Sequence, residues 1–214
     1  DHIKRKSLDL RGFDMVVLDE VDRMLDMGFV NDMRKILARI SKKRQSFFFS
    51  ATMADKVRTL INEFTNNPVM ISVKTGKTVD SVEQNIVKYK SKNDKIEKLH
   101  ELLILNKQNK VLIFDETKRG VDRLSKDLCK RGFNADAIHG NKSQRQRERA
   151  LTKFKTTQTT ILVATDVAAR GIDVKDITYV INYSTPQSYD DYVHRIGRAG
   201  RAGKTGNALT FIEI

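Results

Sequence analysis

The sequence predicts an α/β protein in which mostly parallel sheets are covered by helices on both faces. Two observations indicate this fold class. Short apolar runs alternate with segments of helical periodicity along the chain, as in successive β-α-β units. The apolar runs also lack the alternation of apolar and polar residues that is typical of a sheet with one face in water. We therefore expect the strands to be buried on both sides.

The upstream elements are organised around three apolar runs. Strands are expected at 13–18 (FDMVVL), 46–49 (SFFF) and 69–73 (VMISV), and helical periodicity fills 30–40 and 54–65 between them. The apolar runs have the length of strands, whereas the two periodic segments are long enough for helices. The upstream part of the chain thus predicts strand, helix, strand, helix and strand in that order.

Downstream, the same alternation continues to the end of the chain. Strands are expected at 83–89, 111–114 (VLIF), 135–138, 160–164 (TILVA), 178–182 and 207–212. Helices are expected at 94–105, 118–130, 143–155 and 188–195.

The polar segment 74–82 (KTGKTVDSV) interrupts this pattern, and we interpret it as a linker between two α/β units. Residues 83–214 are numerous enough for a complete domain. Residues 1–73 supply only about three strands, so their sheet is expected to have an exposed edge. Because the chain also begins without a methionine, we expect it to be an N-terminally truncated fragment with an incomplete first domain.

Composition limits the class of protein. The chain is 39% hydrophobic and 31% charged, and none of its apolar runs has the length of a membrane span. The single cysteine, Cys129, cannot form an internal disulfide, which favours a reducing, cytoplasmic location. The net charge is +13, and residues 83–214 hold 25 basic against 16 acidic residues, or +9 of it. This excess indicates a polyanionic partner, although solubility alone could also account for it.

The segment 16–25 (VVLDEVDRML) joins a branched apolar run directly to Asp19, Glu20 and Asp22. In parallel sheets, ligands bind beyond the carboxyl ends of the strands. Two adjacent carboxylates repel each other, and Mg²⁺ held by one of them would relieve that repulsion, leaving the second to orient a water molecule. The alternative is that Asp19 or Glu20 only caps the helix that begins near Val21.

Two later segments add polar groups of the same kind. Ser50-Ala51-Thr52 follows the second strand, although such residues also cap helices. In 192–201 (YVHRIGRAGR), arginines recur at 195, 198 and 201 and glycines at 197 and 200, with a further glycine at 203. Guanidinium groups bind phosphates, and glycines allow a phosphate to approach the backbone closely. A solvated basic turn is the alternative for this segment.

Six segments, in this order, resemble the later motifs of the DEAD-box RNA helicases. They are 19–22 (DEVD), 50–52 (SAT), 111–119 (VLIFDETKR), 139–147 (HGNKSQRQR), 164–174 (ATDVAARGIDV) and 194–201 (HRIGRAGR). The resemblance covers essentially the whole chain, and the sequence as a whole looks like the bacterial members. Val21 is a departure, because the family usually has alanine there. The phosphate-binding loop G-x-x-x-x-G-K-[ST] that the family places before the acidic box is absent from the 214 residues.

The resemblance implies two RecA-like parallel-sheet domains, the first incomplete, joined by a short linker, with ATP bound between them. It implies an ATP-dependent RNA helicase that uses ATP and Mg²⁺, contacts mainly the RNA backbone, works as a monomer and remodels short duplexes or RNA–protein complexes. The fragment itself is expected to be inactive without the phosphate-binding loop. The competing interpretations are a noncatalytic basic RNA-binding module and a DNA-directed member of the wider helicase superfamily.

The resemblance also implies roles for individual residues. Asp19 would bind Mg²⁺ through its waters, and Glu20 would polarise the attacking water. Arg198 and Arg201 would act as arginine fingers on the γ-phosphate, and Gly171 and Asp173 would contact the sugar side of the nucleotide. The residues implied to couple the motifs are Asp22, Ser50, Thr52, His194 and Arg195. His194 could equally be a structural histidine. The implied RNA contacts are Thr117, Arg119, Gly140, Gln144, Arg147, Thr165 and Arg170.

Overall fold

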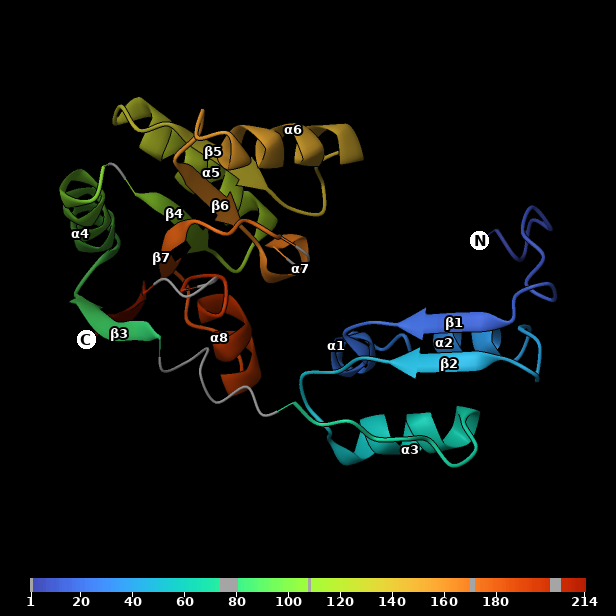
Figure 1. The fold of residues 1–214 in the computed structure, drawn as a ribbon. Coiled ribbons are helices and arrows are strands. Elements are labelled where there is room, and N and C mark those ends of the chain that lie inside the picture. The colour runs from blue at the N-terminus through green and yellow to red at the C-terminus, as the bar shows by residue number, and fades with distance from the viewer. Residues whose placement is uncertain (1, 74–80, 108, 170–171, 201–204) are drawn as a thin grey trace. The chain divides into compact units, whose positions relative to one another are not determined.

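The computed structural model describes residues 2–73, 81–107, 109–169, 172–200 and 205–214. The chain divides into two compact units, Asp1–Val73 and Lys74–Ile214 (Figure 1). Every strand pairing in both units is parallel, and helices connect the strands, so the predicted α/β fold class with parallel sheets is confirmed. No helix among the described residues has both the length and the apolar character needed to span a membrane.

The first unit is built on a pair of parallel strands. Its elements are β1 (Met15–Leu18), α1 (Val21–Asp26), α2 (Val30–Leu37), β2 (Gln45–Phe48) and α3 (Asp55–Phe64). The strands pair from Met15 opposite Gln45 to Leu18 opposite Phe48, so both end at the same edge of the sheet. This edge carries the segments that contain Asp19 and Ser50.

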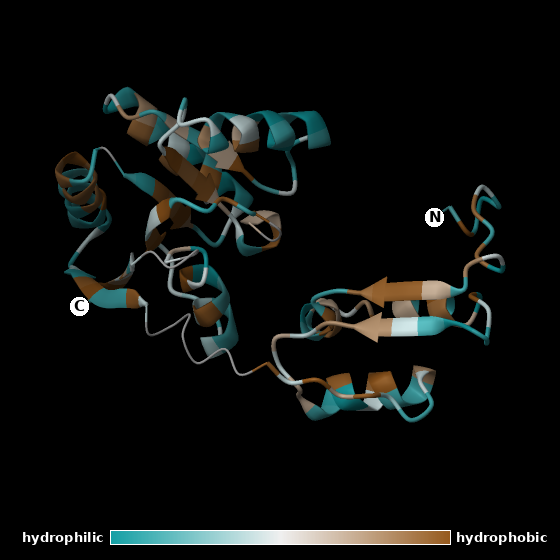
Figure 2. Cartoon of the chain, viewed as in Figure 1, coloured by the Kyte–Doolittle hydropathy of each residue, from teal (hydrophilic) through white to brown (hydrophobic). Residues whose placement is uncertain are grey.

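Only one face of this sheet is buried. Leu18 and Phe48 pack against a core that contains Val21, Met33, Val57 and Leu60 from the three helices. The side chains that alternate with them along the strands, such as Val17 at 55% exposure, face outward. Figure 2 shows that this sheet is nevertheless largely apolar. The expectation of burial on both sides is therefore wrong for the first unit, because the described helices cover a single face.

The strand expected at 69–73 is not formed. Val69, Ile71 and Val73 are 87%, 83% and 77% exposed, and the segment has no ladder with either strand. An apolar run becomes a strand only where a neighbouring backbone offers its N–H and C=O groups. Residues 69–73 make no such pairing with β1 or β2.

The second unit contains a larger parallel sheet with strand order β3-β8-β7-β4-β6-β5. Its elements are β3 (Val82–Tyr89), α4 (Lys92–Leu105), β4 (Lys110–Phe114), α5 (Lys118–Lys130), β5 (Ala135–Ile138), α6 (Gln144–Lys155), β6 (Ile161–Ala164), α7 (Asp166–Ala169), β7 (Ile177–Asn182), α8 (Tyr189–Ile196) and β8 (Gly206–Glu213). All the strands and longer helices expected here are present within a few residues of their predicted bounds. The short helix α7 was not expected.

Helices cover both faces of this sheet, as predicted. Along β4, Val111 and Ile113 join a core layer completed by α4 and α5, whereas Leu112 and Phe114 join the layer completed by α6, α7 and α8. Successive side chains of a strand point to opposite faces. With a core on each side, every position of β4 and β6 is buried, which explains why their sequences lack alternation.

Four helices of the second unit, α4, α5, α6 and α8, begin at side-chain caps. The hydroxyl groups of Ser91, Thr117, Ser143 and Ser188 each accept a hydrogen bond from the backbone N–H three residues ahead. Because the strands are parallel, the ends of β4, β5, β6 and β7 and the starts of the helices that follow them lie at one edge of the sheet. Most of the predicted functional segments of this unit fall at that edge.

The two-sided core predicts an unequal response to leucine truncation. Leu162 on β6 is fully buried, and Leu105 at the end of α4 is 81% exposed. We expect Leu162→Ala to lower the free energy of unfolding by about 2–5 kcal/mol. The matched Leu105→Ala variant should change it by less than about 0.5 kcal/mol. Urea denaturation followed by circular dichroism measures both, and equal losses would contradict the two-layer core.

Candidate active site

The acidic end of β1 has an unusual backbone. Glu20 adopts the left-handed conformation, with φ of 52° and ψ of 47°, which costs a residue other than glycine about 1–3 kcal/mol. Its N–H donates to Asp19 Oδ1 at 2.9 Å, and the N–H of Val21 donates to the carbonyl of Phe49 at 3.0 Å. Glu20 occupies the N-cap position of α1, but its side chain makes no capping hydrogen bond. The capping interpretation therefore does not account for the carboxylate of Glu20.

Asp22 joins the ends of the two strands of the first unit. Its Oδ2 accepts hydrogen bonds from the backbone N–H of Thr52 at 2.9 Å and from the Thr52 hydroxyl at 3.0 Å. Ser50 Oγ donates to the carbonyl of Thr52 at 2.7 Å and closes this turn. Burial by itself raises the pKa of Asp22, but the hydrogen bonds from Thr52 and from the N–H of Arg23 outweigh it and hold the pKa below its ordinary value.

The guanidinium group of Arg195 is the centre of the strand-end network in the second unit. It is 3% exposed, and it binds Asp166 in bidentate fashion at 2.6 and 2.8 Å. It also donates to the carbonyl of Ser184 at 2.7 Å and to Asn182 Oδ1 at 3.2 Å, and it lies 5.1 Å from the centre of the Phe114 ring. Arg195 thus joins α7, the end of β7 and α8 within one unit.

The network extends from Ser184 to the start of α5. Ser184 Oγ donates to Asp115 Oδ1 at 2.5 Å. The N–H of Glu116 donates to both of these oxygens, each at 2.8 Å. Thr117 caps α5 by accepting from the N–H of Gly120 at 2.9 Å. A Cβ atom on Gly120 would collide with the Asp115 carboxylate, so a larger residue here would displace that side chain. The predicted RNA contact Thr117 is therefore fixed beside the Arg195 network.

The other predicted nucleotide contacts are placed as follows. Arg198 follows α8, is half-buried and donates from Nη1 to the carbonyl of Ile172 at 3.3 Å, next to the exposed Asp173. His194 is half-buried on α8. The structure thus brings Arg198 close to the 172–173 segment. Gly171 and Arg201 lie outside the described residues, as does the predicted RNA contact Arg170.

The predicted RNA contacts lie at strand ends and helix starts. Thr117 and Arg119 are exposed at the start of α5, and Gly140 is exposed after β5. Gln144 is the first residue of α6 and donates to Glu148 at 2.9 Å. Thr165 directly follows β6 and is buried, and its carbonyl accepts from Ala168 and Ala169 of α7.

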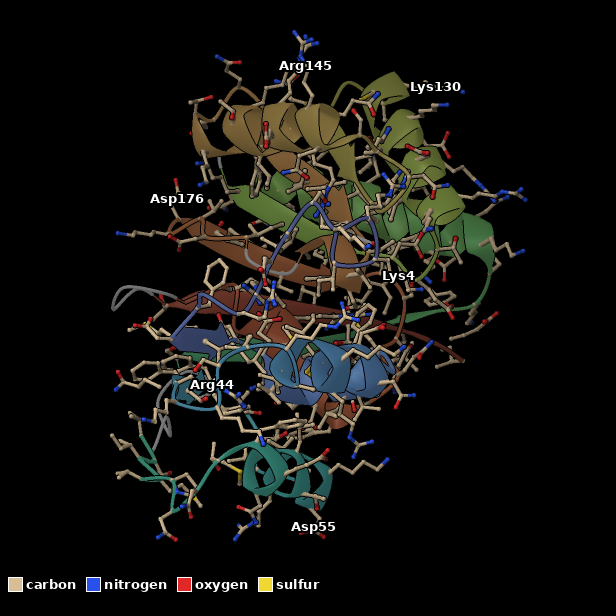
Figure 3. All side chains as sticks on the ribbon, turned by 90° about the vertical axis from the view of Figure 1, so that its right-hand side faces the viewer. Lys4, Arg44, Asp55, Lys130, Arg145 and Asp176 are labelled. Carbon is tan, nitrogen blue, oxygen red and sulfur yellow. The ribbon has the colours of Figure 1, made fainter. Side chains whose placement is uncertain are left out.

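Arg147 differs from the other predicted RNA contacts because it is half-buried one turn into α6. Its Nε atom is fully buried and has no hydrogen-bond partner among the described residues. Buried donors are nearly always paired, so this group is unusual among the described residues. Other cations of the unit, such as Arg145 on α6 and Lys130 at the end of α5, extend outward (Figure 3).

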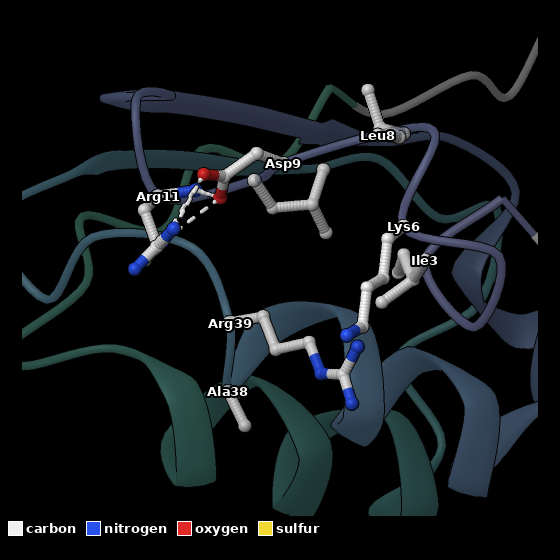
Figure 4. Close-up of a pocket in the computed structure, with 8 residues that line it drawn as sticks. Ile3, Lys6, Leu8, Asp9, Arg11, Ala38 and Arg39 are labelled. Atoms are coloured by element: carbon white, nitrogen blue, oxygen red, sulfur yellow. Dashed lines mark hydrogen bonds and ion pairs between the residues drawn. The ribbon is translucent and has the colours of Figure 1, made fainter.

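Sequence reasoning missed several polar residues of this network: Asp115, Asp166, Asn182 and Ser184. Each ends or closely follows an apolar run, and this is the signal that could have identified them. A pocket in the first unit was also not expected (Figure 4). Lys6 and Arg39 line it, together with an ion pair in which the Arg11 guanidinium lowers the pKa of Asp9 to about 2. None of the predicted site residues lines this pocket.

Both units of the chain match models of known protein families. A model described as the helicase conserved C-terminal domain matches residues 94–203, and a model described as the DEAD/DEAH box helicase matches residues 1–61. The chain is 45% identical over 214 residues to the ATP-dependent RNA helicase CshA of Listeria monocytogenes, covering 100% of this chain and 41% of that protein. It is 46% identical over 213 residues to CshA of Geobacillus kaustophilus, covering 99% and 45%. The chain therefore spans less than half the length of these relatives.

Solved structures are also similar to this chain over its whole length. S. cerevisiae Dbp5 bound to RNA and ADP BeF3 aligns with a TM-score of 0.87 and 32% identity, covering 100% of this chain and 57% of Dbp5. A DEAD box protein from Methanococcus jannaschii aligns with a TM-score of 0.59 and 42% identity, with the same coverage.

The depressed pKa of Asp22 predicts a specific dependence of stability on pH. Because the folded chain holds this carboxylate below its ordinary pKa of 3.8, the unfolded chain binds the proton more readily. The contribution of Asp22 is fully present above pH 3.8 and is lost as the pH falls through the folded-state pKa. Asp22→Asn should lower the free energy of unfolding by about 1–3 kcal/mol at neutral pH. In urea denaturation, this difference should shrink below pH 3.8, whereas a constant difference would contradict the assignment. Asp14→Asn, at an exposed carboxylate, is the control.

The buried ion pair of the second unit predicts a larger effect than a surface pair. Asp166→Asn leaves the buried Arg195 charge uncompensated, and we expect a loss of about 3–5 kcal/mol in the free energy of unfolding. The matched change Glu97→Gln breaks the exposed pair with Arg131, 2.7 Å long, and should cost less than about 1 kcal/mol. Thermal denaturation compares the two variants. Similar melting temperatures would show that Arg195 does not hold α7, β7 and α8 together.

Proposed function

Because the chain belongs to the DEAD-box helicases, we propose that the protein containing it is an ATP-dependent RNA helicase. It couples ATP binding and hydrolysis to local unwinding of RNA duplexes or to remodelling of RNA–protein complexes. The observation that carries the proposal is the end of β1, where Glu20 is held in a strained backbone conformation and its carboxylate is not used to cap the helix. Strained residues of this kind cluster at active sites.

In this proposal the two adjacent carboxylates have different tasks. Asp19 is exposed at the strand end and binds the waters of a magnesium ion, while Glu20 orients and polarises the water that attacks the γ-phosphate. The described residues contain no cluster of three or more metal-ligating side chains, which suits Mg²⁺ because it is held by one or two carboxylates and substrate phosphates. When bound, magnesium neutralises charge on the phosphate oxygens.

The second unit supplies the cations for the phosphates. We propose Arg198 and Arg201 as the residues that stabilise charge on the γ-phosphate, and Gly171 and Asp173 as contacts to the sugar side. In other nucleotide hydrolases, an arginine in this role contributes about 10³–10⁵ in rate. Arg195 has a different role, because its buried donors are taken up by Asp166, Asn182 and Ser184. It couples the motifs by holding them together, as Asp22 does with Ser50 and Thr52 in the first unit.

The proposed RNA contacts are Thr117, Arg119, Gly140, Gln144, Arg147, Thr165 and Arg170. The starts of α5 and α6 present backbone N–H groups and exposed polar side chains, which suit phosphate and 2′-hydroxyl groups. These groups read the RNA backbone, so we expect weak sequence preference. The Arg195 network connects the start of α5 to α8, so we propose that ATP and RNA binding favour each other.

The 214 residues contain no G-x-x-x-x-G-K-[ST] segment, and we propose that they do not hydrolyse ATP appreciably by themselves. The full-length protein is proposed to act as a monomer in the cytoplasm, where its single cysteine within this chain stays reduced.

The proposal is tested by Glu20→Gln in the full-length protein. The amide keeps the size of the side chain but cannot act as a base, so hydrolysis should fall by about 10² or more while ATP and RNA still bind. We expect stable, ATP-dependent retention of RNA, measured by fluorescence anisotropy beside a phosphate-release assay.

Glu101→Gln, at an exposed position of α4, is the matched control and should behave as the wild type. Undiminished hydrolysis by Glu20→Gln would remove Glu20 from its role. RNA affinity that depends on salt but not on nucleotide would favour a noncatalytic RNA-binding module instead.

A further inference from the structure

The loop 139–142, between β5 and α6, is held in place by side chains of α5. We propose that Asp122 and His139 are positioning residues that lock the two RNA-contacting helix starts, those of α5 and α6, into one rigid surface. This inference deepens the proposed function and rests on it, because it concerns how the same RNA contacts are arranged. Neither residue is a predicted RNA contact.

His139 is the buried anchor of the loop. It is 3% exposed, directly follows β5, and its Nε2 lies 3.0 Å from Asp122 Oδ2. Its Nδ1 accepts a hydrogen bond from the N–H of Asn141 at 3.3 Å. Because Nδ1 accepts, the ring hydrogen belongs on Nε2, the nitrogen that approaches the Asp122 carboxylate without a well-aligned hydrogen bond. The imidazole therefore uses both nitrogens to connect the backbone of the loop to α5.

Asp122 holds the loop at a second point. Its Oδ1 lies 2.9 Å from Lys142 Nζ, while the N–H of Lys142 donates to the carbonyl of His139 at 3.0 Å. Both carboxylate oxygens are thus occupied by the first and last residues of the loop. Burial raises the pKa of Asp122, and the hydrogen bonds from Lys142 and His139 lower it by more, so the carboxylate stays charged.

A further contact joins the same two segments one helical turn nearer the start of α5. Lys118 Nζ donates to Asn141 Oδ1 at 2.9 Å. The side chain of Lys118 also passes close to Gly140, where an added Cβ would lie 3.5 Å from Lys118 Cε. Lys118 follows the cap Thr117, and Gly140 precedes the start of α6, so the contacts of α5 run along the whole loop.

This arrangement has a consequence for RNA binding. Backbone contacts to successive nucleotides require donors at fixed separations, and each loosened donor must be ordered again when RNA binds. Without Asp122, His139 and Lys142 would lose their contacts to α5, and the 139–142 loop would move relative to that helix. RNA affinity should then fall, whereas the nucleotide contacts, which lie on other elements, should keep their geometry.

The test uses the full-length protein with three substitutions. Asp122→Asn keeps a single acceptor oxygen and cannot serve both His139 and Lys142. His139→Ala removes both imidazole contacts, and His139→Gln retains an Nε2 donor toward Asp122. Asp127→Asn, five residues along α5 from Asp122, is the matched control. The measurements are the RNA concentration for half-maximal ATPase activity, kcat at saturating RNA, the KM for ATP and the melting temperature.

We expect Asp122→Asn and His139→Ala to raise the half-saturating RNA concentration about tenfold, as the loss of a short contact to a charged carboxylate implies. The kcat and the KM for ATP should stay at wild-type values, His139→Gln should recover part of the affinity, and Asp127→Asn should match the wild type. The double variant Asp122→Asn/His139→Ala should lose little more than the larger single loss, because the residues act as a pair.

Two results would overturn the inference while leaving the proposed function intact. One is RNA half-saturation for Asp122→Asn equal to that of Asp127→Asn. The other is a proportional fall of kcat, ATP affinity and melting temperature in Asp122→Asn and His139→Gln alike, which would indicate a general structural role. Failure of the wild-type protein to bind RNA would instead overturn the proposed function, and the inference with it.

Discussion

The second unit depends on a charge that is removed from water and fully compensated. Burying a guanidinium group costs several kcal/mol unless hydrogen bonds of good geometry replace its hydration. Arg195 has four such bonds, two of them to Asp166, and it packs beside the ring of Phe114. Its partners come from α7 and from the end of β7, and Ser184 passes the connection on to Asp115 and the start of α5. The helix that precedes the proposed arginine finger Arg198 and the helix start that carries a proposed RNA contact are therefore parts of one hydrogen-bonded assembly.

The first unit uses a buried anion for the same purpose. Asp22 lies on α1, directly after the acidic strand end, and it binds the turn that follows β2 through Thr52. In both units, a charged side chain on a helix fixes the polar ends of neighbouring parallel strands. The two cases differ in the sign of the charge and in the number of partners. In both, the buried charge fixes the geometry of the strand ends, and buried charges seldom increase the net stability of a protein.

Much of the fold could be predicted because its signal is local. The apolar runs of β4 and β6 and the caps of the helices are properties of a few consecutive residues. The segment 69–73 was predicted wrongly because pairing depends on a neighbouring backbone that no local pattern reveals. For the candidate site, the strand-end position of Asp19 followed from the sequence. The burial of Arg195 did not, because helical spacing places arginines on a common face without saying whether that face meets solvent or Asp166, which is 29 residues away in the chain.

The left-handed backbone of Glu20 places a second demand on that position besides its chemistry. Glycine, asparagine and aspartate tolerate this region of conformational space, whereas β-branched residues do not. Valine or threonine at position 20 would disturb the turn into α1 as well as remove the carboxylate, but glutamine changes only the carboxylate. Both the backbone torsion angles and the acid–base chemistry therefore restrict which residue can occupy position 20. Only replacements that tolerate the left-handed conformation can therefore test the acid–base role of Glu20.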